Sequence, residues 1–408
     1  MASSTHPKRG SLTIAGTGIA TLAHMTLETV SHIKEADKVY YIVTDPVTQA
    51  FIEENAKGPT FDLSVYYDAD KYRYTSYVQM AEVMLNAVRE GCNVLGLFYG
   101  HPGIFVSPSH RALAIAREEG YEARMLPGVS AEDYMFADLG LDPALPGCVC
   151  YEATNFLIRN KPLNPATHNI LWQVGAVGIT AMDFENSKFS LLVDRLERDL
   201  GPNHKVVHYV GAVLPQSATI METYTIAELR KPEVIKRIST TSSTFYIPPR
   251  DSEAIDYDMV ARLGIPPEKY RKIPSYPPNQ WAGPNYTSTP AYGPEEKAAV
   301  SQLANHVVPN SYKTLHASPA MKKVMIDLAT DRSLYKKYEA NRDAFVDAVK
   351  GLTELEKVAL KMGTDGSVYK VMSATQADIE LGKEPSIEEL EEGRGRLLLV
   401  VITAAVVV

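Results

Sequence analysis

A cluster of tyrosines lies around two basic residues in the first quarter of the chain. Five tyrosines between Tyr66 and Tyr77 are close in sequence to Lys71 and Arg73. The pattern fits a site that needs several phenol hydroxyls around one cation, because a phenol can both donate and accept a hydrogen bond. It fits equally well an amphipathic surface covered by tyrosines. A helix is expected to begin near Thr75, since apolar residues then recur at helical spacing.

Two glycine-containing segments directly follow predicted strands. The apolar run at 93–98 leads into Tyr-Gly-His-Pro-Gly at 99–103, and the strand at 123–126 leads into Pro-Gly-Val-Ser at 127–130. Glycine lets the backbone approach a ligand closely, and open α/β sheets bind ligands at the carboxyl ends of their strands. Both segments therefore predict parts of a ligand site, and Ser130 is also placed as the N-cap of the helix that follows it. His101 taken alone is more typical of an ordinary loop histidine than of a catalyst.

The first glycine turn, Gly16-Thr17-Gly18, does not fit a dinucleotide-binding fingerprint. Thr21 stands where that fingerprint requires Gly or Ala, so a tight strand exit is the favoured interpretation. Strands alternate with helical segments up to about residue 145, which predicts an α/β lobe with a parallel sheet. From about residue 146 strands outnumber helices, which predicts a second α/β lobe with a mixed sheet.

The composition excludes several classes of function. The chain has 408 residues, a net charge of −8 and a pI of about 5.8, so we expect no nucleic-acid partner. No apolar segment is long enough to predict a membrane span, and no apolar signal segment follows the start, so a cytoplasmic location is expected. Of the three cysteines, Cys148 and Cys150 have no second pair and no histidine at zinc spacing. Both are interpreted as packing residues, and no metal site is expected.

The C-terminal part differs from the rest of the chain in its composition and in its predicted secondary structure. A segment at 265–294 is rich in Pro, Tyr and Asn, and from Glu295 onwards the pattern predicts purely helical structure. Helix starts are predicted at Ser318-Pro319 and at the capping-box patterns 353–356 and 386–389, and Gly363 suits a helix end.

The last twelve residues, Leu397–Val408, carry no charge and are mostly β-branched or aliphatic. Such a segment is prone to aggregate when it is exposed. It is either a strand buried in the chain's own core or in a dimer interface, or a substrate delivered to an active site in the same polypeptide.

The two segments at 99–103 and 126–130 together resemble the tetrapyrrole-methylase superfamily of S-adenosylmethionine-dependent methyltransferases, whose fold has two α/β lobes. The tyrosine-rich segment, the helical region after residue 250 and the apolar tail resemble the borosins, fungal backbone N-methyltransferases fused to their own precursor peptide. This resemblance implies a methyltransferase domain at 1–250, with lobes at about 1–145 and 146–250. A helical clasp at 251–392 and a tether with core peptide at 393–408 would follow.

The resemblance also implies an activity and partners. Borosins iteratively methylate backbone amide nitrogens of their own core peptide, the precursor of an N-methylated cyclic peptide. They use S-adenosylmethionine and release S-adenosylhomocysteine. They act as interlocked homodimers in which the tail of one protomer enters the site of the other, and a protease or cyclase can act afterwards.

The family's catalytic tyrosine–arginine–tyrosine set matches Tyr67, Arg73 and Tyr77. An amide nitrogen is a poor nucleophile because its lone pair is delocalised into the carbonyl group, so its proton must be removed. Our hypothesis makes Tyr67 the base and Arg73 the cation that favours its phenolate, while Tyr77 and Tyr99 orient the amide or stabilise its oxygen.

The resemblance places the cofactor and the substrate as well. Cofactor contacts are implied for Tyr99, His101, Pro102, Gly103, Ile104, Phe105, Ser130, Ala131, Gln173, Gly211, Ser243 and Thr244. Methyl acceptors are implied at Leu397, Leu398, Leu399, Val400, Val401, Ile402, Thr403, Ala404, Ala405, Val406, Val407 and Val408.

Two other interpretations remain open from the sequence. One is a methyltransferase of the same fold that acts on a tetrapyrrole or another small molecule. The other is a non-catalytic oligomer in which the C-terminal strand is swapped between copies.

Overall fold

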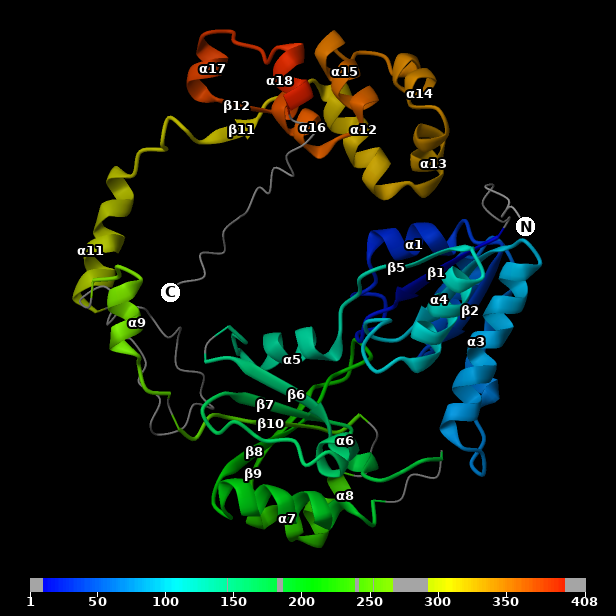
Figure 1. Ribbon diagram of the computed structural model, residues 1–408, viewed down its shortest axis with the longest axis vertical. Helices are drawn as coiled ribbons and strands as arrows, with labels where there is room; N and C mark the ends of the chain where they lie inside the picture. The colour runs from blue at the N-terminus through cyan, green and yellow to red at the C-terminus, as the bar shows by residue number, and fades with distance from the viewer. Residues whose placement is uncertain are drawn as a thin grey trace. The chain divides into compact units, whose positions relative to one another are not determined.

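The computed structural model describes residues 10–144, 146–181, 186–238, 242–251, 253–266 and 293–392. Their contacts divide them into two compact units, one up to residue 266 and one from residue 293 (Figure 1). The proposed tether and methyl acceptors at 393–408 lie outside the described residues. Among the described residues, no helix is long and apolar enough to cross a membrane.

The first lobe contains a parallel five-stranded sheet. Its strands lie in the order β3 (Thr60–Asp62), β2 (Lys38–Ile42), β4 (Asn93–Phe98), β1 (Ser11–Gly16) and β5 (Glu122–Met125). The apolar runs predicted as strands are buried on both faces, as expected for a parallel sheet.

Helices cover both faces of this sheet. Apolar side chains of α3 (Arg73–Arg89) and α4 (Ser107–Glu118) pack on one face, and those of α1 (Leu27–Ile33) and α2 (Pro46–Asn55) pack on the other. The short 3₁₀ helix η1 (Leu63–Tyr66) precedes α3. Helix α3 begins two residues before the predicted start at Thr75, within the usual uncertainty of a helix end.

The second lobe contains the predicted mixed sheet. Its strands lie in the order β6 (Cys148–Glu152), β7 (His168–Trp172), β10 (Thr244–Ile247), β8 (Lys205–Val210) and β9 (Ile220–Thr225). Strands β6 and β7 are parallel, and the other pairs are antiparallel.

One face of this second sheet packs against the core that is formed by α6 (Ala153–Ile158), α7 (Phe189–Leu200), η3 (Ala227–Arg230) and α8 (Pro232–Arg237). The other face packs against α5 (Ala131–Leu139), the helix that follows the second glycine segment. The short turn η2 (Val174–Ala176) follows β7. The two lobes confirm the predicted fold class.

The C-terminal part is mainly helical. Its elements are α9 (Tyr257–Arg262), which belongs to the first unit, and then α11 (Pro294–Gln302), η4 (Leu303–Asn305), α12 (Pro319–Thr330), α13 (Arg332–Ala340), α14 (Arg342–Ala348), α15 (Glu354–Met362), α16 (Asp365–Met372), α17 (Gln376–Glu380) and α18 (Ile387–Glu392). The expectation of purely helical structure after residue 295 was wrong, because β11 (Lys313–Leu315) pairs antiparallel with β12 (Ser373–Thr375). Strands of three residues are too short to produce a periodic pattern.

The predicted helix ends are confirmed. The Ser318 hydroxyl accepts a hydrogen bond from the backbone N–H of Met321, and Pro319 opens α12. Thr353 and Glu356 form a capping box at the start of α15, and Gly363 ends that helix in the left-handed conformation. The buried carboxylate of Glu356 also accepts bonds from the backbone and hydroxyl of Ser318, so it joins the starts of α12 and α15.

Candidate active site

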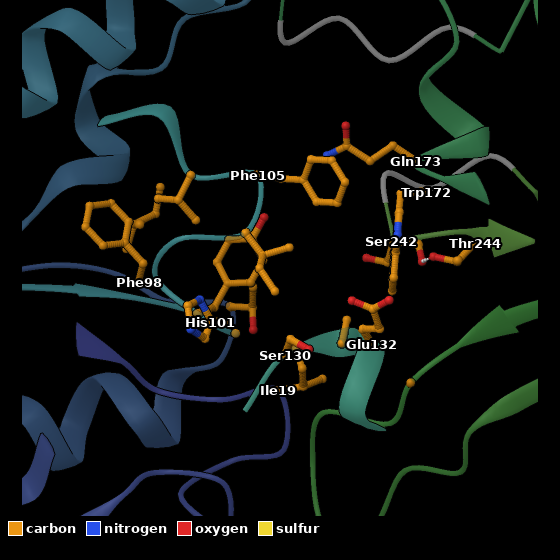
Figure 2. Close-up of a pocket in the computed structure, with 18 of the residues that line it drawn as sticks. Ile19, Phe98, His101, Phe105, Ser130, Glu132, Trp172, Gln173, Ser242 and Thr244 are labelled. Atoms are coloured by element: carbon orange, nitrogen blue, oxygen red, sulfur yellow. Dashed lines mark hydrogen bonds between the residues drawn. The ribbon is translucent and has the colours of Figure 1, made fainter. Parts of the chain in front are cut away.

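A cavity of about 270 Å³ opens at the carboxyl ends of β2 and β4 and is bounded on its other side by residues of the second sheet (Figure 2). The first lobe and α5 contribute Ile19, Ile42, Thr44, Tyr67, Tyr77, Met80, Phe98, Tyr99, Gly100, His101, Ile104, Phe105, Val106, Pro108, Ser130, Ala131, Glu132 and Tyr134. The second lobe contributes Trp172, Gln173, Tyr209, Gly211, Val213, Ser242 and Thr244.

The structure brings most of the predicted site residues together. Those that line the cavity are Tyr67, Tyr77, Tyr99, His101, Ile104, Phe105, Ser130, Ala131, Gln173, Gly211 and Thr244. They come from segments up to 177 positions apart in the chain, counted as 244 − 67. The predicted ligand site at the strand ends is therefore present as a cavity.

Four predicted residues lie beside the cavity without lining it. The hydroxyl of Ser243 is buried and hydrogen-bonded to Nε2 of His208 at 2.9 Å. Pro102 is buried behind the turn, and the Gly103 N–H donates to Nδ1 of His101 at 3.0 Å. These three residues are neighbours in sequence of cavity-lining residues, and the fourth, Arg73, is close enough to the cavity-lining Tyr67 to lower its pKa.

Other cavity residues were not singled out from the sequence. Ile42 and Phe98 are the last residues of β2 and β4, and Trp172 is the last residue of β7. Their position at the ends of predicted strands is the sequence feature from which a place in the ligand site could have been predicted. Glu132 and Tyr134 lie in the first turn of α5, where only the cap at Ser130 had been recognised.

The tyrosine cluster separates into two groups. Tyr67 follows η1 and Tyr77 lies on α3, and their ring centroids are 6.3 Å apart with an interplanar angle of 80°. Both line the cavity together with Tyr99. Tyr72 and Tyr74 are exposed by 59% and 55% of their surface. The interpretation as a site with several phenols therefore holds for Tyr67 and Tyr77, and the interpretation as a tyrosine-covered surface holds for Tyr72 and Tyr74.

Burial has a direct effect on the pKa of Tyr67. It raises the pKa of Tyr67, and the neighbouring Tyr77 and Tyr99 raise it further, while the guanidinium of Arg73 lowers it. Burial also raises the pKa of Tyr99. Arg73 favours the phenolate of Tyr67, as expected, but desolvation raises the pKa by more than Arg73 lowers it. Tyr67 therefore carries its proton at neutral pH.

Arg73 joins the start of α3 to the second lobe. Its backbone N–H donates to the carbonyl oxygen of Thr180 at 3.0 Å, and its guanidinium donates to the carbonyl oxygen of Ile179. The segment that contains both carbonyls follows η2 and Gln173. Arg73 therefore links α3, the helix that carries Tyr77, to the second lobe, in addition to its electrostatic effect on Tyr67.

Comparison with known proteins identifies the family. The family described as Tetrapyrrole (Corrin/Porphyrin) Methylases matches residues 11–228, and the Borosin biosynthesis clasp domain matches residues 291–408. A methyltransferase/ribosomally synthesized type I borosin cyclic peptide precursor from Gymnopilus junonius is 53% identical, covering 99% of this chain and 97% of that protein. The chain belongs to the borosin family.

Two further borosin relatives extend over similar lengths. A type I borosin cyclic peptide precursor from Cerrena unicolor is 54% identical, covering 94% of both chains. The cyclic peptide omphalotin A precursor from Omphalotus olearius is 47% identical, covering 95% of this chain and 94% of that protein. The resemblance inferred from the sequence is thereby confirmed.

The glycine turns of this borosin pack against one another. The backbones of Gly18 and Gly100 exchange two hydrogen bonds, of 2.8 and 3.3 Å. A Cβ atom added to Gly16 would lie 2.2 Å from the carbonyl oxygen of Gly100, and one added to Gly128 would lie 3.3 Å from the same oxygen. The turn at 16–18 is thus a tight strand exit, as predicted, that supports the loop carrying His101.

Two non-glycine residues of the borosin cavity have left-handed backbones. Phe105 and Gln173 each have a φ angle of +57°. This conformation costs about 1–2 kcal/mol for a residue with a side chain, and such strain is concentrated at functional sites. Phe105 comes from the first lobe and Gln173 from the second, and the ring of Phe105 is 6.1 Å from that of Trp172, the residue before Gln173 (Figure 2). The two strained residues therefore lie in the same cavity as Tyr67, Tyr77 and Tyr99.

Proposed function

We propose that this borosin transfers methyl groups iteratively from S-adenosylmethionine to backbone amide nitrogens of its own segment Leu397–Val408. The observation that carries the proposal is the group of three cavity phenols, Tyr67, Tyr77 and Tyr99, in a methylase unit fused to a borosin clasp. Relatives of nearly equal length bear names that join methyltransferase and cyclic peptide precursor in one chain. The product would be the precursor of an N-methylated cyclic peptide.

The cavity suits S-adenosylmethionine chemically. Aromatic rings of Phe105 and Trp172 can contact its base, and the amide of Gln173 and the hydroxyl of Thr244 can bind its polar groups. Such a combination of apolar walls with a few polar groups is typical of cofactor sites. When bound, the donor supplies an electrophilic methyl group and a sulfonium charge that lowers the pKa of a nearby phenol. S-adenosylhomocysteine is the product that leaves.

The phenols then have distinct roles in the proposed reaction. Tyr67 accepts the proton of the amide N–H while the nitrogen forms its bond to the methyl group. Tyr77 and Tyr99 donate hydrogen bonds to the amide oxygen, on which negative charge develops. Since Tyr67 is protonated at neutral pH, we expect it to lose its proton to solvent when the cationic donor binds. Arg73 supports the phenolate and fixes the start of α3.

The acceptor end of the cavity suits the tail. Apolar side chains of Ile42, Met80 and Phe98 contribute to the lining, and they match the aliphatic side chains of the tail. Attachment in the same assembly replaces intrinsic affinity with effective concentration, so a weakly bound peptide can shift its register and react again.

Tandem mass spectrometry of the C-terminal peptide tests this activity, before and after incubation with S-adenosylmethionine. We expect successive additions of one methylene unit on backbone positions within Leu397–Val408. An unmodified tail in a protein that binds the donor would instead support a small-molecule or tetrapyrrole methyltransferase. An unmodified tail without donor binding would support a non-catalytic oligomer with a swapped strand.

The proposed assembly is an interlocked homodimer in which the tail of one protomer enters the site of the other. Large apolar residues are exposed in the stretch 303–315, and the most exposed are Leu303, Val307 and Leu315, at 71%, 81% and 62% of their surface. Exposed apolar groups of this density are typical of interaction surfaces. A protease or cyclase would act on the methylated peptide afterwards. We place these steps in the cytoplasm, since all three cysteines are free thiols.

Delivery between protomers predicts complementation in mixed dimers. A full-length Tyr67→Phe chain supplies a tail but a weakened base, and a chain lacking 394–408 supplies an intact site but no tail. Neither chain alone should show rapid methylation, whereas co-expression should produce a methylated tail on the Tyr67→Phe chain, detected by intact mass. A tail that stays unmodified in verified mixed dimers would exclude delivery between protomers.

A further inference from the structure

Three side chains with metal-ligating atoms meet at the wall of the cavity. Glu132 lies in the first turn of α5, and Cys148 and Cys150 lie on β6. Their ligating atoms are all within 4.8 Å of one another. Sγ of Cys150 is 2.7 Å from Oε1 of Glu132 and 4.0 Å from Sγ of Cys148. Residues two apart on a strand face the same side, which explains why the two thiols converge.

The spacing is close to that of a zinc site. Two thiolates that bind one zinc ion at about 2.3 Å in tetrahedral geometry lie about 3.8 Å apart, and the thiols of Cys148 and Cys150 are already 4.0 Å apart. Thiolate ligands select soft or borderline ions and exclude magnesium and calcium, which prefer oxygen. Small side-chain rotations would place the carboxylate of Glu132 as the third ligand.

The surroundings also favour a cation. Cys148 and Cys150 pack against an apolar cluster that includes Met135 and Ile170, which keeps water away from one side of the thiols. Within the described part of the chain, Glu132 takes part in no salt bridge, and its carboxylate accepts a hydrogen bond from the thiol of Cys150. The proposed methyl transfer assigns no role to either thiol.

We propose that Glu132, Cys148 and Cys150 bind one zinc ion, with water as the fourth ligand. Binding converts two thiols and one Zn²⁺ into a zinc dithiolate and releases two protons, while the carboxylate binds without further proton loss. The ion would tie the first turn of α5 to β6, and so fix the cavity wall next to Ser130 and Ala131. From the sequence alone the cysteines were interpreted as packing residues, because a carboxylate from a distant segment gives no recognisable motif.

Cobalt(II) provides a direct spectroscopic probe of the site. The full-length, untagged protein is fully reduced, freed of metal and titrated with Co²⁺. We expect a thiolate-to-cobalt charge-transfer absorption that saturates at one ion per chain and is abolished by stoichiometric Zn²⁺. Cys148→Ser and Cys150→Ser should each weaken Zn²⁺ binding by about 100-fold or more, since even the partners of metal ligands contribute about 10–100-fold.

Cys92 offers a matched control. It is the third free cysteine, and it packs against the apolar cluster of the first lobe, so Cys92→Ser should retain the full absorption. The proposal is overturned if the reduced wild-type protein gives no charge-transfer band. It is also overturned if the band persists in both Cys148→Ser and Cys150→Ser, or if it disappears in Cys92→Ser. A rise in the Tm of the wild type with Zn²⁺, absent in a folded Cys150→Ser variant, is the second measurement.

Discussion

Tyr67→Phe is expected to lower the rate of backbone methylation by about 10²–10⁴-fold, the usual contribution of a general base. The substitution removes the hydroxyl but retains the ring that packs against Tyr77 at 6.3 Å, so folding and donor affinity should stay close to wild type. Intact-mass time courses with saturating S-adenosylmethionine measure the rate. Tyr74→Phe is the matched control, because Tyr74 lies on α3 but is 55% exposed, and it should keep the full rate.

The pH dependence distinguishes a base from a positioning hydroxyl. In the complex with the donor, the rate should rise about tenfold per pH unit below the pKa of Tyr67, which burial raises and the sulfonium charge lowers. Tyr67→Phe should lose this dependence along with the rate. Rapid methylation in Tyr67→Phe, or a slow variant that keeps the wild-type pH profile, would contradict the role of Tyr67 as the base.

The elements that position the cavity could be predicted because their signals are local. The apolar run at 93–98 followed by glycine at 100 specified both a buried strand and the ligand loop after it. Helix starts at Ser130, Ser318 and Thr353 were likewise predictable, because a cap is formed within four consecutive residues. Local hydrogen bonding does not depend on the rest of the fold.

The features that escaped prediction depend on distant neighbours. Tyr67 and Tyr74 have the same side chain, and their different burial follows from η1 and α3 packing on the sheet. The direction of the pKa shift at Tyr67 depends on desolvation, which no spacing encodes. The convergence of Glu132 with the thiols of β6 requires α5 to pack on the second sheet. Resemblance to the borosins supplied the candidate catalytic and cofactor-binding residues, which the sequence pattern alone did not identify.

Gly16→Ala is expected to weaken donor binding by about tenfold or more. The added methyl group would lie 2.2 Å from the carbonyl oxygen of Gly100 and 2.9 Å from Cδ of Pro102, so the loop carrying His101 must move. Overpacking of this kind lowers the free energy of unfolding by about 1–3 kcal/mol. The Kd for S-adenosylhomocysteine, measured by calorimetry, reports the displacement of the loop without any catalytic step.

Gly120→Ala separates loop displacement from general destabilisation. Gly120 has a φ angle of +84° with no atom within 4 Å of an added Cβ, so alanine there meets backbone strain of about 1–2 kcal/mol but no collision. Both variants should therefore lose similar stability, while only Gly16→Ala should bind S-adenosylhomocysteine more weakly. Equal affinity in the two variants would mean that contact between Gly16 and Gly100 does not set the shape of the cavity. The strained residues Phe105 and Gln173 would then be the determinants left to account for its shape.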